Sequence, residues 1–147
     1  MGTGKKFLVS AVETADGVYT FSAGAGGTHK LIMGTLQHIG QPETTTMNPV
    51  ELLLSGIAGC VGITLHQKAS RENVPIEDLR IRVEGTRPEG ATRSGVHSLQ
   101  INVSVKTTAS AEKIKELVEE SEAACTVSDT LAHAPFVETI VTVEPLI

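Results

Sequence analysis

The stretch that decides the fold is residues 48–65, which read NPVELLLSGIAGCVGITL. Asn48 can cap a helix, Pro49 can take its first position, and the carboxylate of Glu51 can reach back to the cap. We therefore expect a helix to begin here. It is apolar around nearly its whole circumference until His66, which is typical of a helix buried in a core.

Three glycines interrupt this helix, and each costs about 1 kcal/mol relative to alanine. Such a cost suggests that another backbone passes close to Gly56, Gly59 and Gly62. The helix is expected to end before Pro75.

Upstream of the helix, the segment from Lys6 to Gly34 is expected to form a β-meander. Its three apolar runs are 7–12, 18–21 and 31–33, and Asp16-Gly17 between the first two is a tight-turn dipeptide. Residues 24–27, GAGG, are expected to form a flexible turn, because they lack the spacing of a phosphate-binding loop.

Downstream of the helix, residues 79–84 and 99–105 alternate strictly between apolar and polar, which predicts two strands with one buried face. The Gly85–Ser98 segment would be their hairpin loop. A second, amphipathic helix is expected from Ser110, with a short helix over 126–132 and a last strand over 136–143 to follow. This order of elements indicates an α+β fold.

Composition narrows the class of protein. The chain has 147 residues, 40% hydrophobic and 20% charged, which predicts one globular domain over 1–147. No run of about 18 apolar residues and no signal peptide is readable, so we expect a cytoplasmic protein without membrane contact. A net charge of -5, with 12 Lys and Arg spread along the chain, argues against nucleic acid as a partner.

The side chains that could carry chemistry are few. Two cysteines are too few for a zinc site, so Cys60 in the first helix and Cys125 at a helix boundary are inert core residues or a redox pair. No cofactor or metal is expected, and no nucleophile elbow of a hydrolase is present. The five histidines occur at no ligand spacing, at His29, His38, His66, His97 and His133.

Four motifs carry a resemblance to a known family: Asn48–Leu54, Ala58–Cys60, Val74–Leu79 entering a strand, and Cys125–Leu131. In this order they resemble the OsmC/Ohr family of osmotically induced and organic-hydroperoxide-resistance proteins, over nearly the whole chain. The resemblance implies an OsmC-like α+β fold and an intertwined homodimer, with strands of both chains wrapped around cysteine-bearing helices. Active members are thiol peroxidases.

Carried over to this chain, the resemblance makes Cys60 the peroxidatic thiol and Cys125 the resolving one. Cys60 would reduce an organic hydroperoxide or hydrogen peroxide and become a sulfenic acid, and Cys125 would condense with it to a disulfide. A small thiol or a lipoylated protein would then reopen the disulfide.

The thiol of Cys60 needs a donor or cation that lowers its pKa, because an apolar helix face raises it. The family supplies an Arg from the N-terminal strands, held by a Glu directly after the helix-starting Pro. Here Val50 takes that Glu position, and no Arg precedes Arg71. The alternatives that remain open are Lys30, His29, Arg87, Arg93 or no activating cation.

Glu51 is the displaced carboxylate. It lies nine residues before Cys60, about 900° of rotation and roughly 13.5 Å of rise away on one helix, so any contact with that thiol must come from the partner's Glu51. These departures leave two further hypotheses. One is a protein that binds a lipid-like or hydrophobic molecule in the dimer cleft, and the other is a redox-inert member of the family.

Overall fold

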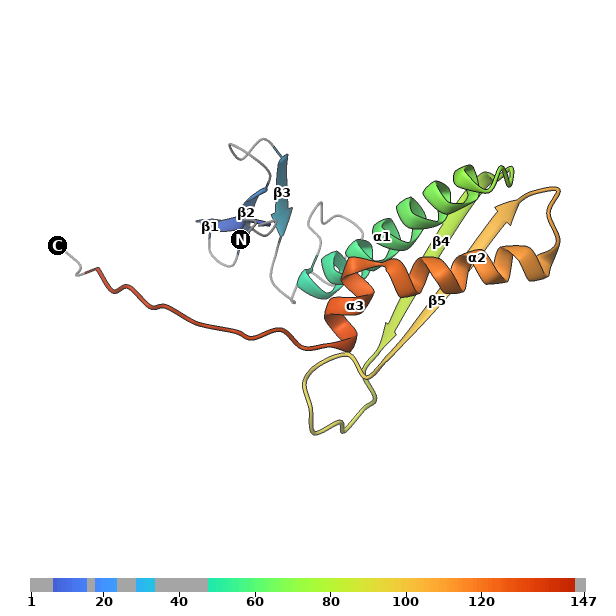
Figure 1. The fold of residues 1–147 in the computed structure, drawn as a ribbon. Coiled ribbons are helices and arrows are strands. Elements are labelled where there is room, and N and C mark those ends of the chain that lie inside the picture. Colours follow the sequence, from blue (N-terminus) through green and yellow to red (C-terminus); the bar gives the residue numbers. More distant parts are fainter. Residues whose placement is uncertain (1–6, 16–17, 24–28, 34–47, 145–147) are drawn as a thin grey trace. The chain divides into compact units, whose positions relative to one another are not determined.

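The computed structural model describes residues 7–15, 18–23, 29–33 and 48–144. The chain divides into two compact units, Met1–Ser55 and Gly56–Ile147. Figure 1 shows the elements of each unit. The expectation of a single domain over 1–147 stays a prediction.

The N-terminal unit contains a three-stranded antiparallel sheet in the order β1-β2-β3, formed by Val9–Ala15, Val18–Ala23 and His29–Met33. The expected meander is confirmed, although β1 begins two residues later than the apolar run and β3 two residues earlier. The turn at Asp16-Gly17 and the glycine-rich segment 24–27 lie outside the described residues.

Helix α1 spans Pro49–Arg71 and begins with the predicted reciprocal cap. The Oδ1 atom of Asn48 accepts hydrogen bonds from the N–H of Val50 at 2.8 Å and of Glu51 at 3.0 Å. In return, Oε2 of Glu51 accepts the N–H of Asn48 at 3.0 Å. These bonds satisfy backbone donors that have no partner inside the helix, and so they fix where α1 begins.

The burial of α1 differs from the expectation. Only one stripe is buried, consisting of Ile57, Val61, Leu65 and Ala69. Ile63, by contrast, is 63% exposed. The reason is that, within the unit Gly56–Ile147, the hairpin and α2 pack against a single side of the helix.

By length and composition α1 could also cross a membrane. That is weak evidence, because the core helix of a globular protein passes the same test.

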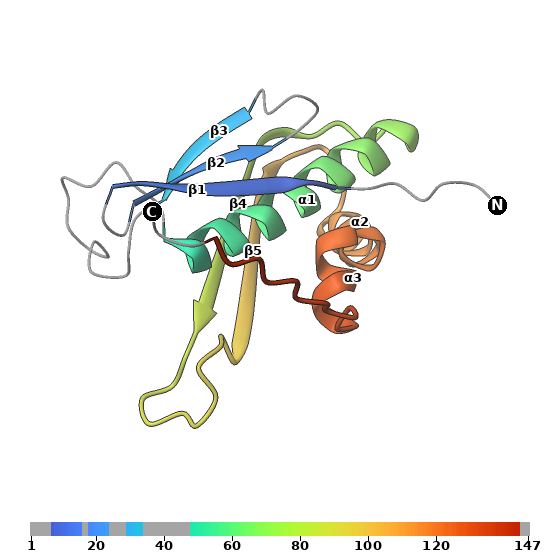
Figure 2. The ribbon, with the colours of Figure 1, turned by 90° about the vertical axis from the view of Figure 1, so that its left-hand side faces the viewer.

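Strands β4 (Glu77–Thr86) and β5 (Ser98–Lys106) form the predicted antiparallel hairpin around the loop 87–97. Its pleat is one-sided: alternate residues such as Ile81 and Val103 are half-buried, while Arg82 and Asn102 are exposed. Figure 2 shows α1 and α2 beside this hairpin. The apolar positions of the predicted alternation therefore lie on the face that the helices cover, and the polar positions lie on the face exposed to solvent.

Helix α2 (Ala111–Ala124) begins at the N-cap Ser110, whose side chain accepts the N–H of Lys113. Its apolar stripe joins α1 and the hairpin in one core cluster. The buried members are Leu65, Ala69 and Leu117, and the half-buried ones are Val74, Ile76, Leu79, Val103, Ile114 and Val118.

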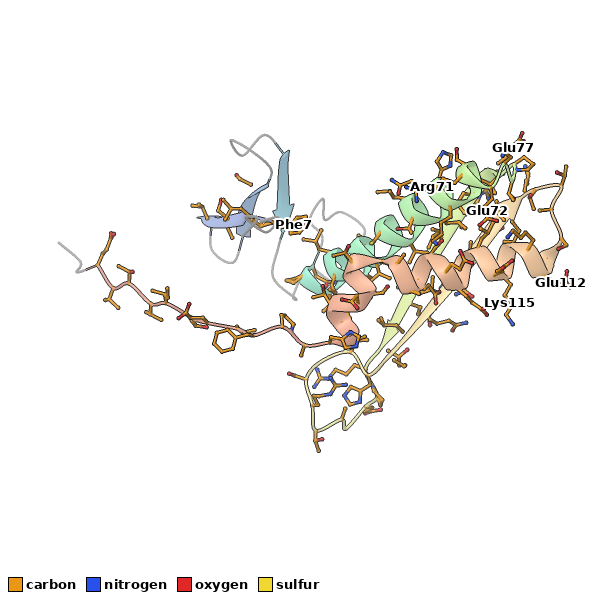
Figure 3. The ribbon with its side chains drawn as sticks, in the orientation of Figure 1. Phe7, Arg71, Glu72, Glu77, Glu112 and Lys115 are labelled. Carbon is orange, nitrogen blue, oxygen red and sulfur yellow. The ribbon has the colours of Figure 1, made fainter. Side chains whose placement is uncertain are left out.

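At the edge of this core, the ammonium of Lys113 forms ion pairs with Glu72 at 2.6 Å and with Glu116 at 3.0 Å. These pairs raise the pKa of Lys113 to about 12. Figure 3 shows Glu72 at this end of α1. The pair with Glu72 joins the residue directly after α1 to the first half of α2, and the pair with Glu116 lies within α2.

Helix α3 spans Thr126–Ala132, as predicted. The predicted last strand over 136–143 is not formed: the chain leaves α3 in an extended conformation without a strand partner (Figure 1). Its apolar side chains are open to solvent, with Phe136 92% and Ile140 82% exposed. A strand requires a neighbour for its backbone hydrogen bonds, and the described residues of the unit Gly56–Ile147 supply none here.

Candidate functional site

Cys125 lies at the junction between two helices, where it ends α2 and caps α3. Its backbone is extended (φ -75°, ψ 116°), and its N–H donates to the carbonyl of Glu122 at 3.2 Å. Its Sγ atom accepts the N–H of Ser128 at 3.4 Å. The thiol thus takes the place that a Ser or Asp side chain usually occupies at a helix N-cap.

Cys60 lies in the middle of α1, next to the buried stripe. Its carbonyl accepts the hydroxyl of Thr64 at 2.8 Å. The fold brings its thiol within hydrogen-bonding distance of the thiol of Cys125, although 65 positions separate the two residues. Both cysteines are free thiols.

The two thiols differ in their access to solvent. Cys60 is partly exposed, whereas Cys125 is 0% exposed. An external reactant can therefore touch part of Cys60 and no part of Cys125.

The two thiols also differ in acidity. Burial raises the pKa of Cys60, and the adjacent Cys125 raises it further through its hydrogen bond and charge, while the backbone N–H groups of Val127 and Thr126 act in the opposite direction. For Cys125, burial acts to raise the pKa, but hydrogen bonds from Cys60 and from the N–H and side chain of Ser128 outweigh it and lower the pKa. Cys125 is consequently the first of the pair to lose its proton. The thiol of Cys60 then donates a hydrogen bond to the Cys125 thiolate.

None of the side chains in the described part of the chain that could act as a cation is among the groups that shift the pKa of either thiol. Arg93 donates instead to the carbonyl of Val96 at 3.2 Å, and Arg87 likewise plays no part. Lys30 and His29 belong to β3, and their side chains lie outside the described residues. What the sequence did not reveal is that backbone N–H groups at the start of α3, those of Val127 and Thr126, act on the thiol of Cys60.

Glu51 is committed to its own helix cap through Asn48. A contact between Cys60 and the partner's Glu51 stays a prediction.

Among residues 7–15, 18–23, 29–33 and 48–144, no three His, Cys, Asp or Glu side chains group together in a way that could hold a metal ion. His97 and His133 bond locally, to the carbonyls of Arg93 and Asp129. His38 lies outside the described residues.

A cavity of about 230 Å³ lies at the opposite end of the hairpin from its loop. It is lined by Pro75, Glu77, Lys106, Thr107 and Thr108. This charged and hydroxyl-bearing lining does not resemble an apolar ligand cleft.

Comparison with known proteins places this geometry in a family. The model of the OsmC-like proteins matches residues 40–140. The chain is a member of the OsmC-like protein family. An OsmC-like protein from Mycoplasma pneumoniae has the same fold, with a TM-score of 0.77 and 22% identity over 90% of this chain and 91% of that one.

An organic hydroperoxide resistance protein from Legionella pneumophila also shares the OsmC-like fold, with a TM-score of 0.64 and 18% identity over 90% of this chain and 93% of that one. An uncharacterized protein of Methanocaldococcus jannaschii is 28% identical over 88 residues, which span 58% of this chain and 45% of that protein. The fold expected from the sequence is thus confirmed, and the family to which this OsmC-like chain belongs includes thiol peroxidases.

Proposed function

We propose that this OsmC-like protein is a thiol peroxidase that reduces organic hydroperoxides or hydrogen peroxide through a Cys60–Cys125 disulfide. The observation that carries the proposal is the contact between the two thiols, which come from different helices and lie close enough to share a hydrogen bond.

Cys60 is the residue that meets the peroxide, because it is the one of the pair that is partly open to solvent. Attack requires a thiolate. Since Cys125 is the more acidic thiol, a proton first passes along the hydrogen bond from Cys60 to the thiolate of Cys125. The Cys60 thiolate so formed is a minor species, and the N–H groups of Val127 and Thr126 are the donors that favour it.

The reaction then balances without a further cofactor. The Cys60 thiolate attacks the distal peroxide oxygen, the O–O bond breaks, and Cys60 becomes a sulfenic acid. The departing alkoxide takes the proton held by Cys125, which returns that residue to the thiolate. The Cys125 thiolate attacks the sulfenic sulfur, a disulfide forms, and hydroxide leaves and is protonated to water.

A second copy of the chain is the partner that we propose for assembly. Two features support a homodimer: apolar side chains of α1 such as Ile63 are open to solvent, and so is the extended apolar segment over 136–143. Exposed apolar surface of this extent is typical of an interaction site. A thiol or a lipoylated protein is the proposed reductant.

The test is stopped-flow oxidation with cumene hydroperoxide and with hydrogen peroxide, followed by mass spectrometry of the product. We expect one disulfide, between Cys60 and Cys125, and a rate that rises with pH, because the pKa of Cys60 is raised. The variant Cys60→Ser should consume no peroxide. Oxidation of the wild type no faster than that of a small free thiol would exclude the peroxidase function.

A further inference from the structure

We propose that an external thiol opens the Cys60–Cys125 disulfide at the sulfur of Cys60, and that Cys125 is the leaving group. The inference rests on the proposed function only in requiring that this disulfide forms. It assigns a direction to the reducing half of the cycle: the mixed disulfide is carried by α1 and not by the junction between α2 and α3.

Access to the two sulfurs decides where the attack occurs. A thiolate must approach the sulfur that it attacks in line with the bond that breaks, and so that sulfur has to be open to solvent. Cys60 is partly exposed, while Cys125 is 0% exposed and is enclosed where α2, α3 and α1 meet. Attack on Cys125 would require the junction to open first.

The backbone around Cys125 suits a departing thiolate. The N–H of Ser128 already points at its Sγ atom at 3.4 Å, and it belongs to the first turn of α3, where backbone donors have no carbonyl partner inside the helix. A disulfide opens faster when the sulfur that leaves is the more acidic one. The pKa of Cys125 is lowered, and that of Cys60 raised, in the reduced pair.

The step conserves atoms and electrons. The incoming thiolate forms a bond to the sulfur of Cys60, the Cys60–Cys125 bond breaks, and the electron pair of that bond leaves on Cys125. A second external thiolate then attacks the sulfur of the external group and releases Cys60 as a thiolate, while the external groups leave as a disulfide. The two thiols supply the two electrons that the protein disulfide takes up.

The experiment uses the full chain, oxidised with diamide so that no peroxide is involved. Glutathione is added, the reaction is quenched with acid and N-ethylmaleimide after short intervals, and tryptic peptides are mapped by mass spectrometry. Trypsin separates the two cysteines, because Cys60 falls in the peptide 31–68 and Cys125 in the peptide 116–147. We expect glutathione on 31–68 and N-ethylmaleimide on 116–147, with the reverse pattern rarer by about tenfold.

Two single-cysteine variants give a second measurement. With glutathione disulfide, Cys125→Ser should form a stable mixed disulfide at Cys60, and Cys60→Ser should react at Cys125 slower by about tenfold. Glutathione found mainly or equally on 116–147, equal labelling of the two variants, or failure of diamide to form the bond would each overturn the inference.

The inference and the proposed function fail separately. A chain inert to peroxide whose diamide-made disulfide still opens at Cys60 would lose the peroxidase function and keep the direction of reduction. A chain that consumes peroxide while glutathione attaches to Cys125 would do the opposite.

Discussion

Gly59 provides the sharpest test of the proposed homodimer. A Cβ atom added at this position meets nothing within 4 Å in the described part of the chain. If a second copy covers α1, the methyl group of Gly59→Ala enters the interface, where overpacking costs about 1–3 kcal/mol per site. A symmetric dimer contains two such sites, so the loss is about 2–6 kcal/mol, and the dissociation constant should rise roughly 30-fold or more. The gain in helix propensity, about 1 kcal/mol, is present in the free and the paired chain and cancels from that constant.

Sedimentation equilibrium of the wild type and the variant measures this change, and Gly62→Ala is the matched control. It lies three residues further along the same helix, but its added Cβ would lie 3.0 Å from the Cδ1 atom of Ile81, inside the chain. Its dissociation constant should equal that of the wild type. If Gly59→Ala also leaves the constant unchanged and raises the melting temperature by about 2–4 °C, as about 1 kcal/mol would, no second copy lies over this face.

Three further predictions concern single side chains. In Cys125→Ser the pKa of Cys60 should fall, because the hydrogen bond and charge of Cys125 both raise it, and iodoacetamide alkylation across pH measures the change; an unchanged profile would contradict this cause. Asn48→Ala removes the Oδ1 atom that accepts the N–H of Val50 and of Glu51, while the backbone N–H that donates to the Glu51 carboxylate stays; it should cost about 1 kcal/mol in thermal unfolding followed by circular dichroism, and an unchanged melting temperature would contradict this role of the cap. Leu117→Ala empties a site that is 0% exposed and should cost about 2–5 kcal/mol in urea unfolding with an unchanged slope; a cost below about 1 kcal/mol would mean that the cluster collapses to fill it.

Local elements were predictable from the sequence because their causes are local. The start of α1 follows from Asn48, Pro49 and Glu51 within a single turn, and the bonds observed there are the ones that these side chains can make. The hairpin follows from alternation between apolar and polar residues, and α3 from residues 126–132. In each case the information lies within a few positions.

The prediction of a last strand was wrong because its cause is not local. Residues 136–143 have the composition of a strand, but a strand exists only where a neighbour accepts its hydrogen bonds. The same holds for α1: its apolar circumference predicts burial, while the amount buried depends on what covers each side, and the unit Gly56–Ile147 covers one. Composition indicates what a segment requires, and not whether the same chain supplies it.

The groups that shift the pKa of Cys60 were likewise only partly predictable from the sequence. Motif resemblance was sufficient to single out Cys60 and Cys125, and the apolar helix around Cys60 was sufficient to predict a raised pKa. The donors are backbone N–H groups at the start of α3, and every residue except proline carries such a group, so no residue type marks them. A search for a cationic side chain could not have found them.

The two thiols therefore differ in solvent accessibility as well as in acidity. Cys60 is accessible but keeps its proton, and Cys125 loses its proton readily but is enclosed, so neither thiol alone has both properties that a fast nucleophile needs. The hydrogen bond between them makes the pair titrate as one unit, so an apparent pKa measured from the peroxide rate belongs to the pair. Only the single-cysteine variants separate the two contributions. A Cys125→Ser chain that attacks peroxide at a lower pH than the wild type, yet stops at the sulfenic acid, would show that Cys125 restrains the first step and is required for the second.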